Sequence, residues 1–194
     1  TGDGGSDLSL DASKLTAQRT STPGRATVKG VAVSAINRDD LETIGVSGGG
    51  AGTFAANIGG SVNVITETTA AFVAGGAAVN RGTDTTDAAT SAQSVLVAAG
   101  NDLYHMGIGG AISLAGAAAI TPGADVTVIT NDTRAAIDDG ALVQAERDIT
   151  VTASAQEDFL SIAAGVGGAG TVGIGVAAGV LVMNTTTSAR IGDD

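Results

Sequence analysis

The chain has 194 residues, of which 43% are hydrophobic but only 2% aromatic, with 30 glycines, no cysteine and a formal net charge of −11. This length suits one domain or a section of a larger array. The composition excludes a disulfide framework, thiol catalysis and cysteine-ligated metals. The acidic balance argues against nucleic acid or an anionic membrane as the main partner. A core of Ala, Val, Ile and Gly must be narrow, because the large area that aromatic side chains bury is missing.

The first element along the chain is a partial, atypical repeat over residues 1–30. Its stretch SDLSLDAS (6–13) resembles RDITVTAS (147–154), and the turn signal STPGR (21–25) follows. The chain opens with TGDGGSD, without an initiator Met or a signal-like apolar segment. It is therefore expected to be a piece of a longer protein.

Three repeats follow, over residues 31–94, 95–148 and 149–194. They align through equivalent Thr69, Thr133 and Thr187, which gives spacings of 64 and 54 residues. The first two repeats share 19 identities over 50 aligned positions, whereas composition alone would give about six, so the repetition is real. The ten-residue difference falls in the polar segment Arg81–Ser94, which is typical of a surface loop.

Within each repeat, apolar residues alternate with small or polar ones at the period of a strand. Val62 and Val64 are one example, and Val126 and Val128 are their equivalents. Corners such as Ala74–Gly76 and Asp138–Gly140 separate the strands. About six short strands fit each repeat, which predicts two or three coils per repeat and a rod about 30–45 Å long. The predicted fold is all-β: one right-handed parallel β-helix, or β-solenoid, over residues 1–194.

One uncharged stretch, IAAGVGGAGTVGIGVAAGVLVM (162–183), has the length of a membrane span. Its second copy (108–129) carries Pro122 and Asp125, and its first copy has Asn57 and Asn63. A membrane span would not tolerate these residues, so the stretch is expected to form two or three consecutive strands rather than a span.

The stretches DITVTASAQEDFLSIAAGVGGAG, GVLVMNTTTSARIGDD and TRAAIDDGALVQAERDITVTA resemble repeats of large bacterial surface exoproteins. These are the filamentous haemagglutinin and leukotoxin-type adhesins and autotransporter passengers. The resemblance spans roughly residues 31–194. It implies a secreted or surface-anchored β-helical stalk used in adhesion, with no catalytic motif to transfer.

His105, the only histidine, lies beside the only tyrosine, Tyr104. Leu41 and Phe159 occupy its position in the other repeats, so a wall or edge residue is favoured over a metal ligand or acid-base group. Threonines such as Thr150 and Thr152 could form part of an ice- or carbohydrate-binding ladder. Their equivalents in the preceding repeat are Leu and Ala, so no such ladder continues.

Arg38, Asp39 and Asp40 form the densest charged cluster and the best starting point for an enzyme. Because the equivalent positions differ between repeats, a solvated loop is the favoured interpretation. The acidic corners Asp138–Asp139 and Asp193–Asp194, and the calcium-motif-like start of the chain, are interpreted as turns. Calcium would need six to eight converging oxygens.

No catalytic, cofactor-binding or metal-ligating residue is assigned, and no cofactor is expected. The expected function is a non-catalytic structural or adhesive stalk segment outside the bacterial cell. Its partners would be neighbouring repeats and a surface glycan or protein receptor, with no nucleic acid and no membrane span. Two alternatives stay open: a carbohydrate-active β-helix, which needs converging carboxylates in a groove, and a calcium- or ice-binding solenoid.

Overall fold

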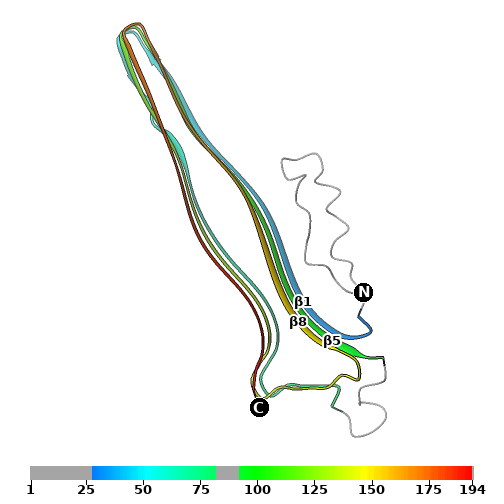
Figure 1. Ribbon diagram of the computed structural model, residues 1–194. Helices are drawn as coiled ribbons and strands as arrows, with labels where there is room; N and C mark the ends of the chain where they lie inside the picture. The colour runs from blue at the N-terminus through cyan, green and yellow to red at the C-terminus, as the bar shows by residue number, and fades with distance from the viewer. Residues whose placement is uncertain (1–27, 82–91, 194) are drawn as a thin grey trace.

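The computed structural model describes residues 28–81 and 92–193, and within these ranges it contains strands and no helix (Figure 1). A three-stranded sheet and a four-stranded sheet run side by side and meet at one end of the molecule, where each chain segment turns from one sheet into the other. The predicted partial repeat at residues 6–13, the turn at 21–25 and most of the loop at 81–94 lie outside the described residues.

All strand pairs in the described part of the chain are parallel. Sheet A is ordered β1–β5–β8, and sheet B has β6 in the centre, with β2 and β3 on one side and β9 on the other. A short pair, β4 and β7, lies at the opposite end from the turns. The strands are β1 (Gly30–Ala51), β2 (Phe54–Ala56), β3 (Gly59–Val73), β4 (Ala78–Val79), β5 (Ser94–Ala115), β6 (Ala118–Ile137), β7 (Leu142–Val143), β8 (Ile149–Ala169) and β9 (Val172–Ile191).

The register of both sheets reproduces the sequence repeat. Thr69 pairs with Thr133 and Thr133 with Thr187, so the offsets of 64 and 54 residues are those of the ladders. The prediction of two or three coils per repeat is wrong, because each repeat forms a single layer of two long strands. Sequence periodicity marks where a strand alternates but not where it ends, and the Arg38–Asp40 cluster, interpreted as a loop, lies inside the 22-residue strand β1. The three layers span only about 10–15 Å along the stacking direction, not the predicted 30–45 Å.

The predicted corners at the base of the molecule are confirmed. Ala74–Gly76 and Asp138–Gly140 each leave a long strand, and Gly76 and Gly140 have φ angles of 75° and 71°. Glycine adopts this left-handed conformation without the steric cost of a Cβ. The stretch 162–183 forms the end of β8, a turn and the start of β9, as expected for consecutive strands.

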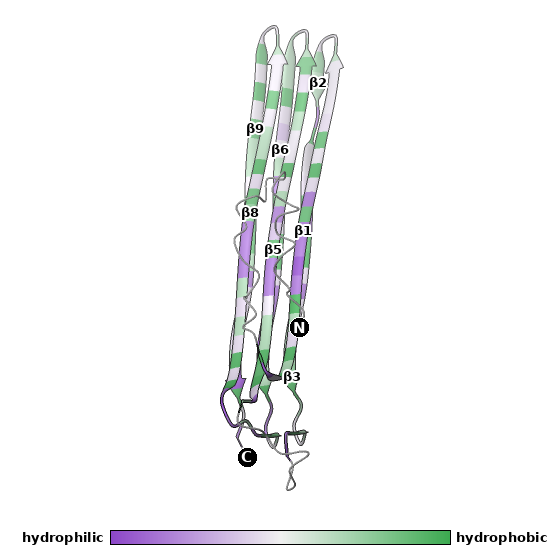
Figure 2. Ribbon diagram, turned by 90° about the vertical axis from the view of Figure 1, so that its right-hand side faces the viewer, coloured by the Kyte–Doolittle hydropathy of each residue, from purple (hydrophilic) through white to green (hydrophobic). Residues whose placement is uncertain are grey.

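Side chains alternate between the space enclosed by the two sheets and their outer faces. Near the base the enclosed side chains are apolar, with Val97 and Ile137 as fully buried examples. Farther along, the enclosed positions become polar, and Figure 2 shows the matching hydrophilic stretches in the middle of β1, β5 and β8. The core cluster is Ala71, Val73, Val97, Ala99, Ala135 and Ile137.

Toward the turns, glycines bring the two sheets into backbone contact. A Cβ on Gly109 would overlap the carbonyl oxygen of Ala124, and one on Gly59 would overlap that of Gly110. Packed sheets normally lie about 10 Å apart because side chains fill the gap between them. The absence of side chains therefore makes this half of the molecule thinner.

The alternating valines of sheet B face outward rather than into the enclosed space. Val62 and Val64 are each 74% exposed, whereas their neighbours Ser61 and Asn63 lie on the enclosed side and bond across to the next layer. The predicted strand period is thus confirmed, although it does not identify the buried face. In the described ranges, no helix has the length and apolar character needed to cross a membrane.

Candidate functional site

The charged cluster Arg38, Asp39 and Asp40 does not form a loop or a single site. The three residues lie in the middle of β1 and are half-buried, so the interpretation as a solvated loop is wrong. Strand alternation directs Asp39 to the enclosed side and the other two to the outer face, where Arg38 Nε lies 3.9 Å from a carboxylate oxygen of Asp102. Their side chains therefore do not converge on one face.

A polar seam, defined as Asn37, Asp39, Glu67, Asn101, Asn131 and Glu157, fills the middle of the enclosed space. Its hydrogen bonds connect neighbouring layers and also connect the two sheets. Asn101 donates from Nδ2 to Glu67 Oε2 at 2.6 Å, and Asn131 donates from Nδ2 to Glu157 Oε1 at 2.7 Å. Asn37 donates to Asn101 Oδ1 at 3.1 Å and to Asp39 at 2.9 Å. The seam thus links all three layers through side chains.

Three carboxyl groups share this seam, those of Asp39, Glu67 and Glu157, and the surroundings of Glu67 shift its pKa. Burial raises the pKa of Glu67 above its ordinary value of 4.5, while the hydrogen bond from Asn101 lowers it. A hydrogen bond with Asp39, and the negative charges of Asp39 and Glu157, raise the pKa further. Because the folded state holds the Glu67 proton more tightly than the unfolded state, stability is lost as the pH rises from 4.5 through the raised value.

Glu67→Gln is expected to raise the free energy of unfolding at pH 7 by about 1 kcal/mol, because it removes a buried charge and keeps the acceptor for Asn101. This gain should vanish below about pH 4, where the carboxyl group is protonated in both states. Urea denaturation at several pH values measures the difference. Glu42→Gln on the exposed face of β1 is the matched control and should leave the pH dependence as in the parent chain. A Glu67→Gln effect equal at pH 4 and pH 7 would contradict the assignment.

A second enclosed network surrounds Asp125, which is completely buried. Ser61 donates to one of its carboxylate oxygens from the first layer, and Ser161 donates to the other at 2.5 Å from the third layer. His105 lies close by, with Nε2 3.1 Å from Thr127 Oγ1. The carboxylate is thereby held by hydroxyl groups from both neighbouring layers.

His105 is enclosed between the sheets and only 2% exposed, in agreement with its interpretation as a wall residue. Burial lowers the pKa of its imidazole, while the Asp125 charge and the Leu41 backbone raise it. Serine, histidine and aspartate occur together here, but His105 contacts Thr127 rather than a serine, and both His105 and Asp125 are shielded from solvent. The network therefore has the character of an internal support rather than a nucleophilic centre.

The acidic corner at Asp138–Asp139 is tied to a neighbouring layer by an arginine. Arg190 Nη2 lies 2.5 Å from Asp138 Oδ1, and Nη1 lies 3.9 Å from Asp139 Oδ1. In residues 28–81 and 92–193, no three histidine, aspartate or glutamate side chains lie close enough to hold a metal ion. An ion pair, rather than a cation site, accounts for this corner.

Thr150 and Thr152 lie in β8 as exposed outer residues, and their equivalents Leu96 and Ala98 are buried. A regular outward threonine array is therefore missing at these positions. Thr69, Thr133 and Thr187 do stack in register, but they do so on the enclosed side of sheet B. Tyr104 lies on the outer face of sheet A and is buried.

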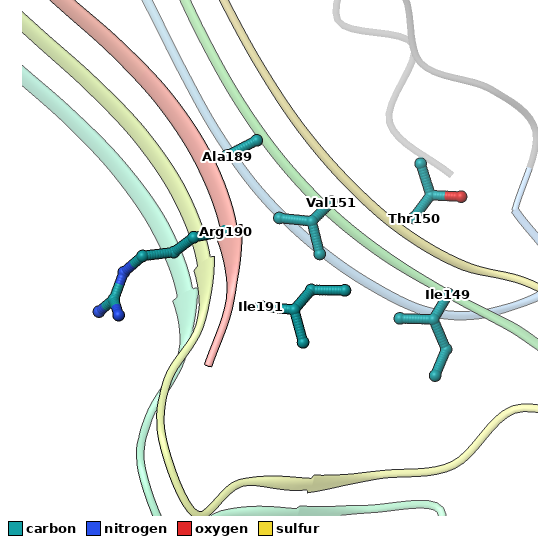
Figure 3. A pocket seen from close by; sticks show the side chains of 6 residues that line it. All are labelled: Ile149, Thr150, Val151, Ala189, Arg190 and Ile191. Carbon is teal, nitrogen blue, oxygen red and sulfur yellow. The ribbon is translucent and has the colours of Figure 1, made fainter. Parts of the chain in front are cut away.

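A hollow of about 370 Å³ opens at the base of the C-terminal layer, between β8 and β9. Figure 3 shows Val151 and Ile191 directed into the space between the two strands, while Arg190 points away from it. Its lining is mainly aliphatic, and it lies on the enclosed side of the last layer. It is lined by Ile149, Thr150, Val151, Ala189, Arg190 and Ile191.

Sequence reasoning missed Asp125, Glu67, Glu157 and the asparagines as interior residues. One signal was present: Asn37 and Asn101 are identical in the aligned repeats, whereas the charged residues that follow Asn37 have different equivalents. Comparisons with known proteins add no further assignment, since no family model, curated protein or solved structure matches the chain.

Proposed function

We propose that the chain is a non-catalytic structural and adhesive segment of a large secreted or cell-surface bacterial protein, folded as a right-handed parallel β-helix. The observation that carries this proposal is that residues at equivalent positions of the sequence repeats pair with one another in the parallel sheets. Repeats that stack in register form a quasi-one-dimensional body that lengthens by adding further repeats.

The interior supports a mechanical rather than a chemical role. Its carboxylates are engaged by asparagine and serine side chains from neighbouring layers, so they bind the layers together instead of facing a substrate. Two hollows at the surface of the described residues lack a pair of converging carboxylates. The one at the base of the last layer has no carboxylate in its lining, and the other has a single one, Asp138, beside Arg134 and Arg190. A polysaccharide-cleaving site would need such a pair on an accessible face.

The resemblance of the repeat sequences to those of filamentous haemagglutinin-like proteins and autotransporter passengers also supports this proposal. In such a protein the segment would hold a receptor-binding region away from the cell, and neighbouring repeats would be its first partners. Its own contacts with a surface glycan or protein would be weak and spread over polar loops.

An antibody raised against residues 31–194 tests the proposal on the bacterium that produces the protein. We expect it to label intact cells without permeabilisation, and we expect the purified chain to release no reducing ends from acidic or neutral polysaccharides. Labelling that requires permeabilised cells would contradict the surface location. Release of reducing ends that is lost in Asp40→Asn, a substitution on the outer face of β1, would instead favour the carbohydrate-active alternative.

A further inference from the structure

The outer face of sheet B is apolar in the half of the molecule near the turns. A Cβ on Gly59, Gly123 or Gly175 would overlap the backbone of sheet A, so these odd-numbered positions point inward. Because side chains alternate along a strand, their even-numbered neighbours point outward. The outward residues are all apolar or glycine, and the strand register aligns them across the three layers. They define the apolar face: the even-numbered residues of 54–64, 118–128 and 172–182.

The apolar face is open to solvent although it carries large side chains. Ile58 is 80% exposed, and Phe54 and Val176 are each 55% exposed. In the described part of the chain, sheet B has another sheet beside it only on its enclosed side (Figure 1). Six columns two residues apart span about 40 Å, and three layers span about 14 Å, so the face covers roughly 560 Å² as a flat projection. Exposed apolar patches of this size mark interaction sites.

The centre of the apolar face has a ridge beside a groove. The ridge consists of Ile58, Pro122 and Val176, and the groove consists of Gly60, Ala124 and Ala178. Two further apolar columns lie on each side of this pair. A second copy turned by 180° about the stacking direction would place its ridge over this groove and its groove over this ridge. A copy turned about the strand direction would instead place ridge on ridge. The shape of the face therefore selects the first arrangement, in which the two stacks run parallel.

The distribution of charge permits this contact although each chain carries a net charge of −11. On the outer face of sheet B, the charged residue nearest to the apolar face is Asp132, which accepts a hydrogen bond from Arg134 Nε at 2.6 Å. The rotation axis would pass at the level of Gly123, nine residues from Asp132. The two Asp132 side chains of a dimer would thus lie about 60 Å apart, far beyond the Debye length of about 8 Å.

A lipid surface fits the apolar face less well than a second copy does. Faces that bind membranes carry Lys or Arg beside their apolar residues, together with aromatic side chains. The column that borders the apolar face is instead uncharged, and Phe54 is the one aromatic residue within the face. This bordering column consists of Thr66, Thr130 and Asn184.

We propose that the apolar face is an interaction surface for a second copy of this chain, which docks face to face about a two-fold axis along the stacking direction. Three layers provide less than the roughly 800 Å² per partner of a standard stable interface, so the contact is weak. Each further layer of a longer stack would add about 190 Å². Neighbouring repeats stack along the axis and leave this face open, so the contact is compatible with the proposed function and does not require adhesion.

Val126→Lys tests the inference in the full chain at pH 7. We expect the parent chain to show a monomer–dimer equilibrium with a Kd on the order of 100 µM by sedimentation equilibrium. Val126→Lys should raise this Kd at least about tenfold, because it places a charge in the centre of the apolar contact. Ile112→Lys is the matched control: it makes the same change on the outer face of sheet A, in the same layer, and should leave the Kd unchanged.

Cross-linking tests the orientation, since the chain has no cysteine of its own. In the selected arrangement Val126 faces Ile120 of the second copy, whereas the two Val126 side chains lie about 20 Å apart. A mixture of Val126→Cys and Ile120→Cys chains treated with a short bismaleimide should therefore give cross-linked dimers of the two variants. Either variant alone should give few.

Three results would overturn the inference. The first is a parent chain that stays monomeric up to about 1 mM, and the second is equal dimerisation of Val126→Lys and Ile112→Lys. The third is a monomeric chain that floats with phosphatidylcholine vesicles unless Val126 is replaced by Lys, which would assign the face to a lipid surface. Circular dichroism separates these outcomes from failure of the proposed function: a monomeric chain with a strand spectrum leaves the stalk proposal intact, whereas a helical spectrum would refute both.

Discussion

Gly109→Ala is expected to lower the free energy of unfolding by about 3 kcal/mol, at the upper end of the cost of overpacking. The new methyl group would occupy the position of the Ala124 carbonyl oxygen in the opposite sheet. Relief would require the sheets to separate along a stretch where other glycines also pack against backbone. Guanidinium denaturation followed by circular dichroism measures the loss.

Gly48→Ala is the matched control. A Cβ at Gly48 would have the carbonyl oxygen of Ile112 as its nearest neighbour, at 3.9 Å, which is an ordinary contact. This variant should be neutral or more stable by about 0.5 kcal/mol, because alanine loses less backbone entropy than glycine on folding. Equal destabilisation by both variants would contradict the close approach of the sheets at Gly109.

Leu103→Ala should cost about 3 kcal/mol, within the range measured for leucine truncations in cores. Leu103 is completely buried in the central layer and is the only apolar residue between the carboxyl groups of Asp39 and Glu157. Its loss creates a cavity and also brings two negative charges into closer interaction. Thermal and urea denaturation at pH 7 measure the change.

Leu114→Ala, on the same strand but 63% exposed, should change the stability by less than about 0.5 kcal/mol. Combining Leu103→Ala with Glu157→Gln should recover part of the loss, since the second change removes one of the two charges. If Leu103→Ala were as mild as Leu114→Ala, the assignment of Leu103 to the enclosed side would fail.

The repeat could be predicted from sequence because identical residues recur at fixed offsets, and these offsets are the registers of the ladders. The presence of strands was also predictable, because the alternation of apolar and polar residues is a local property of the sequence. The length of the strands could not be predicted. Asn37–Asp40 and the glycines near Gly45 look like corners locally, yet stacking against neighbouring layers keeps them extended.

The polar interior could not be predicted from single positions. An asparagine or glutamate in a strand is normally assigned to solvent, because burial without a partner is unfavourable. Asn101 and Glu67 satisfy each other across the two sheets, although they lie 34 residues apart in the sequence. Only the long-range pairing reveals that the polar side of sheet B faces inward and that valines such as Val62 and Val64 face outward.

The close backbone contact near Gly109 and Gly59 also affects how the molecule responds to force. Resistance of a plate to bending rises steeply with its thickness, so the thin half near the turns should bend across its faces more readily than the base, where valine and isoleucine side chains separate the sheets. Bending within the plane of a sheet must instead stretch ladder hydrogen bonds. Such a segment should bend easily across the faces of its sheets and remain stiff within their plane.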